Sequence, residues 1–81
     1  MKQHSHHVYI TDFGHVSQHS IFLKIAGFDA EKAQEFTGEV RILNGYLYGD
    51  LIHRERTELS ESCRAFIECR LLTKYENGDF R

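Results

Sequence analysis

The chain has 81 residues and a mass of 9.5 kDa, which suits one hydrophobic core, so a single domain is expected. Its content of 41% hydrophobic, 27% charged and 12% aromatic residues excludes disordered, collagen-like and transmembrane proteins. Ten Lys and Arg against twelve Asp and Glu give a formal net charge of -2, which argues against a general duplex DNA-binding protein.

The sequence predicts a cytoplasmic protein without a membrane segment. No apolar run approaches the ~18 residues of a membrane span, and the polar, His-rich start lacks the apolar segment of a signal peptide. Cys63 and Cys69 are six residues apart, which is too far for an internal disulfide along either a helix or a strand. Both cysteines are expected to be reduced and to face the same core.

Residues 1–7 are expected to form a flexible, His-rich N-terminal segment, and residues 8–81 a single α+β domain. Residues 8–13 are rich in β-branched and aromatic side chains, which is typical of a strand. A second strand is predicted around residues 21–25, where apolar residues alternate with Phe22, Lys24 and Ala26. A polar loop over residues 14–20 is expected to join the two strands.

A short helix is predicted next, between residues 28 and 36. Asp29 is a favourable N-cap, Glu31 suits the first turn, and Gly38 follows closely enough to end the helix. Three side chains are expected to face inward from it: Phe28, Ala33 and Phe36.

The dipeptide Asn44-Gly45 predicts a β-hairpin, because both residues adopt the positive φ angles of a type I′ turn easily. The expected pairs are Leu43 with Tyr46, Ile42 with Leu47, Arg41 with Tyr48, and Val40 with Gly49. This register puts four apolar residues on the core face: Val40, Ile42, Leu47 and Leu51. The opposite face then carries Arg41, Leu43, Tyr46 and Tyr48.

Two interpretations compete for residues 63–75. A helix over residues 58–75 would gather an apolar stripe but would put Arg70 and Lys74 in its middle. A strand puts both cysteines and several apolar residues on one face, so the strand is favoured. The predicted fold is therefore α+β, a small antiparallel sheet of about five strands with one short helix, in the order β-β-α-β-β-β. The alternative, with the last long element helical, is β-β-α-β-β-α.

A strand as long as residues 63–75 would project beyond its neighbours and leave unpaired backbone groups. A homodimer through that edge is one expectation.

Two histidines of the chain suggest a metal site. His15 and His19 are four residues apart and would share a face of a helix, but Gly14 and nearby serines indicate a loop. They are weak candidates for metal ligands, and no cofactor is expected.

Asp50, His53 and Glu55 form the other group of ionisable side chains that could support acid–base chemistry. They lead into the charged run at residues 54–56, which is typical of a solvated surface. No nucleophile stands in a known motif and no glycine loop resembles a phosphate site, so an enzyme is not expected.

The outer hairpin face is the leading candidate site. Arg41, Leu43, Tyr46 and Tyr48 combine apolar area, two hydroxyls and a guanidinium, residue types enriched at protein interfaces. The favoured function is a protein-binding module that acts stoichiometrically on a larger protein, as an inhibitor, adaptor or assembly component. The same tyrosines and Arg41 could stack on single-stranded RNA or DNA, which is the alternative. A His-rich metal-binding protein is the third hypothesis.

Overall fold

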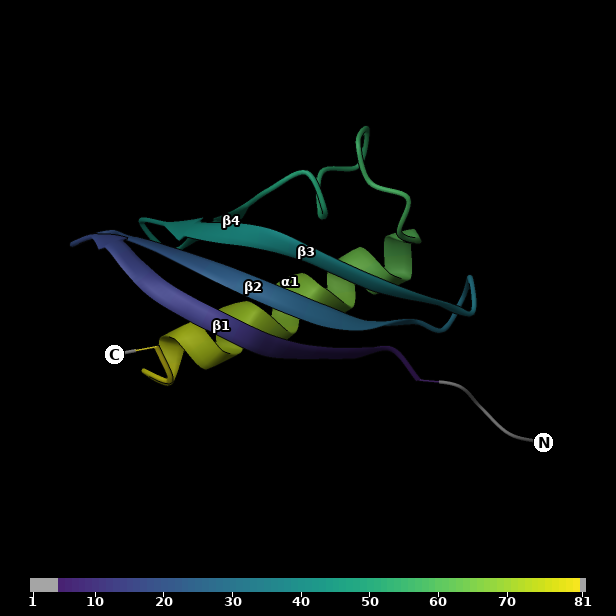
Figure 1. Cartoon of the computed structure of the whole chain (residues 1–81), viewed down its shortest axis with the longest axis horizontal. Coiled ribbons are helices and arrows are strands. Elements are labelled where there is room, and N and C mark those ends of the chain that lie inside the picture. The colour runs from purple at the N-terminus through teal and green to yellow at the C-terminus, as the bar shows by residue number, and fades with distance from the viewer. Residues whose placement is uncertain (1–4, 81) are drawn as a thin grey trace.

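A computed structural model describes residues 5–80, which form four strands followed by one helix (Figure 1). The strands are β1 (His7–Ser17), β2 (Ser20–Asp29), β3 (Gln34–Leu43) and β4 (Tyr46–Tyr48), and the helix is α1 (Glu61–Glu76). All neighbouring strands are antiparallel, in the order β1-β2-β3-β4. The sheet is therefore a meander in which each strand pairs with the next one along the chain.

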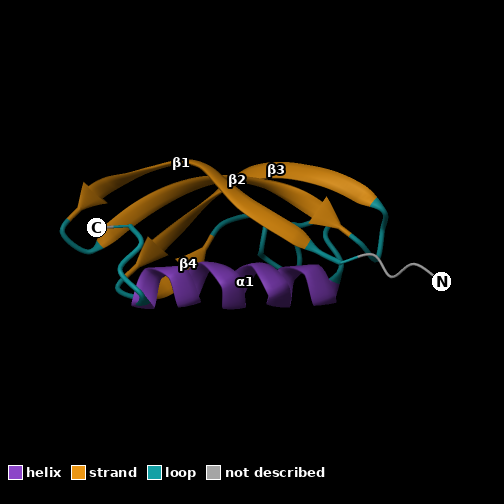
Figure 2. Ribbon diagram, turned by 90° about the horizontal axis from the view of Figure 1, so that it is seen from below, coloured by secondary structure: helices purple, strands orange, loops and turns teal. Residues whose placement is uncertain are grey.

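The strands arch over α1, which runs beneath one face of the sheet (Figure 2). The core lies between the two layers, because alternate residues of β2 and β3 point toward the helix. Its buried members are Ile21, Leu23, Ile25, Phe36, Val40, Ile42, Ile52, Cys63, Ile67, Leu71 and Phe80. No helix packs on the opposite face of the sheet within residues 5–80, so that face is open to solvent.

β1 and β2 are longer than the sequence pattern indicated. The predicted loop over residues 14–20 is wrong, since Gly14 and His15 pair with Phe22 and Ile21, and the turn lies between Ser17 and Ser20. A Cβ atom at Gly14 would lie 2.6 Å from the ring of Phe22. Glycine therefore lets a half-buried ring lie across β1, so residue 14 is a packing position within a strand.

The predicted short helix at residues 28–36 is also wrong. Asp29 does cap backbone amides, as expected of an N-cap, but the amides belong to a tight turn: its Oδ1 accepts from the N–H groups of Glu31 and Lys32. Ala33 has a φ of 51°, which reverses the chain into β3. The segment is therefore the β2–β3 turn, and Phe36 reaches the core from a strand.

The β3–β4 hairpin confirms the Asn44-Gly45 prediction. The two turn residues have φ angles of 53° and 85°, and Leu43, Ile42 and Arg41 pair with Tyr46, Leu47 and Tyr48 as predicted. Strand β4 ends at Tyr48, so the predicted pairing of Val40 with Gly49 falls beyond the ladder.

Residues 61–76 are helical, so the strand favoured for residues 63–75 is wrong. Ser60 is the N-cap and accepts from the Cys63 N–H, and Lys74 lies in the last turn. The buried residues follow a narrow i, i+4 ridge, Cys63, Ile67 and Leu71. This ridge leaves Arg70 exposed beside the interface, and Lys74 reaches Asp79 at 3.9 Å, so neither charge needs burial.

Two further expectations depended on that strand. The homodimer was predicted through the edge of residues 63–75, and a helix offers no such edge. The two cysteines, both free, also lie on different sides of α1, since Cys63 is buried and Cys69 is exposed.

The molecule is thus a small α+β fold with one antiparallel sheet, as predicted, but with four strands and a C-terminal helix. The alternative sequence interpretation anticipated the last helix correctly. No helix within the described part of the chain combines the length and apolar character that crossing a membrane requires.

Candidate functional site

The four residues predicted as a binding surface lie together on the open face of the sheet, and we call them the hairpin patch: Arg41, Leu43, Tyr46 and Tyr48. Leu43 pairs with Tyr46, and Arg41 with Tyr48, so the four side chains form two adjacent cross-strand rows. Leu43 is 40% exposed, Tyr46 68% and Tyr48 52%. The side chains are therefore available to a partner and contribute little to the core.

Phe22 extends the hairpin patch and was not among the predicted site residues. It pairs with Arg41 across β2 and β3, so the backbone places Arg41 between Phe22 and Tyr48. The alternation of Phe22 with the buried Ile21 and Leu23 already indicated an outward position. What the sequence did not reveal is that β2 lies directly beside β3, which brings this ring to the patch.

The rest of the open face is charged in its middle. Lys24 pairs with Asp12 on one side and Glu39 on the other. Beyond this row, Tyr9 is 59% exposed opposite Ala26. The open face carries two basic residues against three acidic ones: Lys24 and Arg41, against Asp12, Glu35 and Glu39. The face thus lacks the positive excess that a nucleic acid backbone attracts.

A second group of functional side chains lies where β2 ends and α1 begins. Ligand atoms of His6, Asp29 and Cys63 all lie within 4.8 Å of one another. Asp29 is fully buried and accepts from the Ser60 N–H at 2.7 Å and the Ser60 hydroxyl at 2.8 Å. His6 Nδ1 accepts from the Ala30 N–H at 3.0 Å, and its ring lies 5.8 Å from that of Phe66.

Two of these groups have shifted pKa values. Burial raises the pKa of Asp29, but hydrogen bonds from Ser60, Lys32 and Glu31 outweigh it and leave that pKa below its ordinary value. Burial, with the Asp29 carboxylate nearby, raises the pKa of the Cys63 thiol to about 11. At neutral pH the pair is therefore a carboxylate beside a neutral thiol.

This cluster does not fit a metal site. Both Asp29 oxygens already accept hydrogen bonds, and His6 Nδ1 accepts one from a backbone amide. Cys63 would have to become a thiolate to bind a metal ion, whereas its environment favours the thiol. The bonded donors and acceptors instead stabilise the junction between β2, α1 and residue 6.

Nor does the cluster form a nucleophile and base. Because the Ala30 N–H donates to Nδ1 of His6, the neutral ring carries its proton on Nε2 and donates to the Ser62 hydroxyl at 2.9 Å. Ser62 in turn donates to Glu31. His6 in this tautomer cannot take a proton from Ser62, and Cys63 is inaccessible to a substrate.

The other candidate residues are dispersed. His15 lies in β1 and His19 in the turn before β2, and neither belongs to a group of three metal-ligand side chains among residues 5–80. His53 accepts from the backbone N–H of Glu55, and Asp50 lies 4.0 Å from Arg56 in an exposed ion pair. These contacts fit a solvated loop.

The predicted N-terminal segment, residues 1–7, lies partly outside the described residues, which begin at residue 5. His7 is the first residue of β1, and His6 belongs to the cluster described above.

Comparison with known proteins gives no match to a family model, a curated protein or a solved structure. The function is therefore inferred from the chain's own surfaces.

Proposed function

We propose that this protein is a small intracellular protein-binding module that occupies a surface of a larger protein through the hairpin patch. It acts as a stoichiometric inhibitor, adaptor or assembly component and not as a catalyst. One observation carries the proposal: α1 covers only one face of the sheet (Figure 2), and exposed tyrosine, leucine and arginine side chains gather on the other. Two free cysteines are compatible with a reducing compartment such as the cytoplasm.

The chemistry of the patch supports one kind of partner. Tyr46 and Tyr48 offer rigid aromatic area with a hydroxyl at the tip, a combination that suits an apolar pocket with a polar rim. Arg41 stands between Phe22 and Tyr48 and favours a carboxylate on the partner. We therefore propose a folded protein that presents an apolar depression beside an acidic side chain.

Single-stranded RNA or DNA is the second candidate, because aromatic side chains on an open sheet face are a common stacking platform. The acidic balance of the open face opposes it.

The experiment is affinity capture from nuclease-treated lysate, with wild-type protein and with the double variant Tyr46→Ala, Tyr48→Ala. Tyr9→Ala is the matched control, since Tyr9 is equally exposed on the same face but lies on β1. We expect wild type and Tyr9→Ala both to retain one partner protein that the double variant loses. This partner should bind the purified chain with 1:1 stoichiometry. Equal capture by all three, or specific recovery of nucleic acid without nuclease, would contradict it.

A further inference from the structure

Strand β3 has an unpaired edge. It spans ten residues, whereas β4 spans three and pairs only with Arg41, Ile42 and Leu43. The Asn44 N–H donates to the His19 carbonyl at 2.9 Å, just beyond the end of the β2–β3 ladder. Because hydrogen-bonded pairs alternate along an antiparallel ladder, the even-numbered residues of β3 direct their backbone groups toward β2. The N–H and C=O groups of Glu35 and Thr37 therefore point away from β2, on the side where no further strand lies within residues 5–80.

The chain leaves this edge at Gly49. Its φ is 150°, and a Cβ there would lie 3.1 Å from the Glu39 carbonyl oxygen, so only glycine suits this close turn. Ile52 then donates to the Gly49 carbonyl and enters the core, which draws the following residues off the sheet. Among residues 5–80, no backbone hydrogen bond of a turn, loop or cap uses Glu35 or Thr37.

The other edge of the sheet differs. β1 has register shifts between Ile10 and Asp12 and between His15 and Ser17, and bulges of this kind discourage pairing with another strand. The β2–β3 ladder is continuous from Ser20↔Leu43 to Asp29↔Gln34, and the chain has no proline. The edge of β3 is therefore regular and able to accept a further strand.

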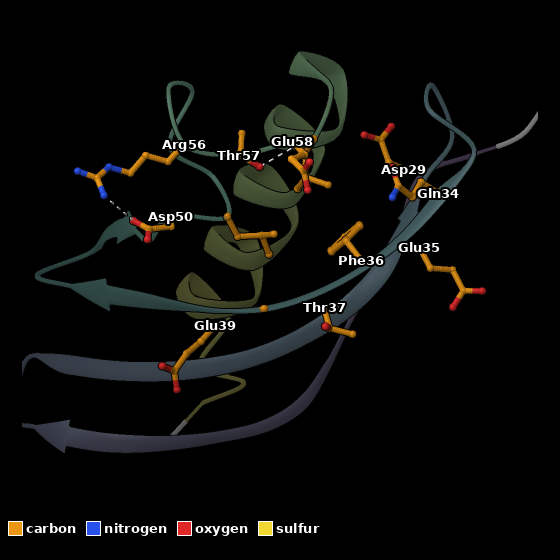
Figure 3. Close-up of a pocket in the computed structure, with 13 residues that line it drawn as sticks. Asp29, Gln34, Glu35, Phe36, Thr37, Glu39, Asp50, Arg56, Thr57 and Glu58 are labelled. Carbon is orange, nitrogen blue, oxygen red and sulfur yellow. Dashed lines mark hydrogen bonds and ion pairs between the residues drawn. The ribbon is translucent and has the colours of Figure 1, made fainter.

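A groove follows this edge. It lies between residues 34–39 of β3 and residues 50–59, and has a volume of about 400 Å³ (Figure 3). Three apolar side chains contribute to its lining, Phe36, Leu51 and Leu59, and Leu51 packs against Gly38. Four exposed carboxylates also line it, against a single guanidinium, that of Arg56: Glu35, Glu39, Asp50 and Glu58.

We propose that this groove binds an extended, basic segment of a partner protein by adding it as a strand to the edge of β3. The backbone N–H and C=O groups of Glu35 and Thr37 supply the pairing. Side chains of the added strand alternate between the two faces of the sheet. One set packs toward Phe36 and Leu51, and the other lies beside Glu35 and Glu39, so the occupant alternates apolar and basic residues.

This proposal goes beyond the hairpin patch and does not depend on it. The patch uses side chains of an open face, whereas the groove uses the backbone edge and carboxylates. Tyr46→Ala, at the far end of the hairpin, is therefore expected to leave peptide binding unchanged whether or not the patch binds a protein.

The test uses a seven-residue peptide in which lysine and valine alternate, with blocked ends, titrated into isotopically labelled protein at low salt. A scrambled peptide, with its valines together and the same charge, is the control. Binding should perturb the amides of residues 34–39 and slow hydrogen exchange at Thr37. Thr37→Pro removes the edge N–H without touching the β2–β3 ladder, whereas Thr37→Ala keeps it.

The proposal expects the alternating peptide to bind Thr37→Pro at least tenfold more weakly than wild type or Thr37→Ala. Glu35→Lys with Glu39→Lys should weaken binding similarly, whereas the same charge change on α1, Glu68→Lys with Glu76→Lys, should not. No saturable binding up to about 1 mM peptide, the weak end of the affinity scale, would overturn the proposal. So would equal binding of the scrambled peptide, equal binding to Thr37→Pro, or a Thr37 amide that is already protected in the free protein.

Discussion

Asp29 holds the polar junction of the fold, and its replacement by alanine should destabilise the protein strongly. The carboxylate accepts four hydrogen bonds: from the N–H groups of Glu31, Lys32 and Ser60, and from the Ser60 hydroxyl. It joins the end of β2 to the N-cap of α1, 31 residues later in the chain. Removing it therefore affects the turn and the helix docking together.

The magnitude follows from where each donor lies. Glu31 and Lys32 are exposed, so water can replace the carboxylate at their amides, at a cost of about 0.5 kcal/mol each. Ser60 is half-buried and loses two short bonds to an ionised group, each worth about 1.5 kcal/mol net. We expect Asp29→Ala to lower the free energy of unfolding by about 4 kcal/mol, a large share of the ~5–15 kcal/mol typical of a domain.

Urea unfolding followed by circular dichroism measures this loss. Ser60→Ala, which removes only the capping hydroxyl, should cost about 1 kcal/mol, and the double variant should cost less than the two single changes together. Asp79→Ala is the control, since its exposed ion pair with Lys74 should contribute about 0.5 kcal/mol or less. A loss at Asp29→Ala no larger than at Asp79→Ala, or strict additivity with Ser60→Ala, would show that Asp29 does not join β2 to α1 as described.

Three further outcomes are expected. Gly45→Val, which forces a β-branched residue to a φ of 85°, should destabilise by about 1 to 2 kcal/mol, and an unchanged denaturation midpoint would contradict the hairpin's importance. Hydrogen bonding lowers the pKa of Asp29 below its unfolded value, so the stabilisation by the Asp29 carboxylate is present above about pH 4 and is lost as the pH falls below it. The free energy of unfolding of Asp29→Asn should therefore depend less on pH in denaturation curves from pH 6 to 3. Cys69 should react readily with a thiol reagent at pH 8 and buried Cys63 only as fast as the protein unfolds, so equally rapid labelling of both would be inconsistent with the fold.

Local turn chemistry explains what the sequence predicted well. Asn44-Gly45 specifies a turn without help from distant residues, and the turn sets the register that gathers Arg41, Tyr46 and Tyr48 on one face. The hairpin patch followed from this register alone. Phe22 was missed because its place depends on the pairing of β2 with β3.

Tertiary contacts explain the errors. Asp29 carries a genuine capping signal, but its carboxylate caps a tight turn and also binds Ser60, which no local pattern reveals. The C-terminal helix was only the second choice because its fully buried residues, Cys63, Ile67 and Leu71, form a stripe narrower than the usual amphipathic pattern. The unpaired edge of β3 likewise depends on where β4 ends. The alternation of apolar residues does not predict that one strand of a hairpin is shorter than its neighbour.

The most direct measurement for the proposed function compares partner affinity and folding stability in Tyr48→Ala. The partner retained by wild type and Tyr9→Ala is titrated calorimetrically, and unfolding is measured on the same samples. Because Tyr48 is 52% exposed in the free protein, we expect Tyr48→Ala to weaken partner affinity by about 2 kcal/mol, near thirtyfold, with a much smaller loss of folding stability. Undiminished affinity in a folded Tyr48→Ala variant would contradict a contact surface at the hairpin patch.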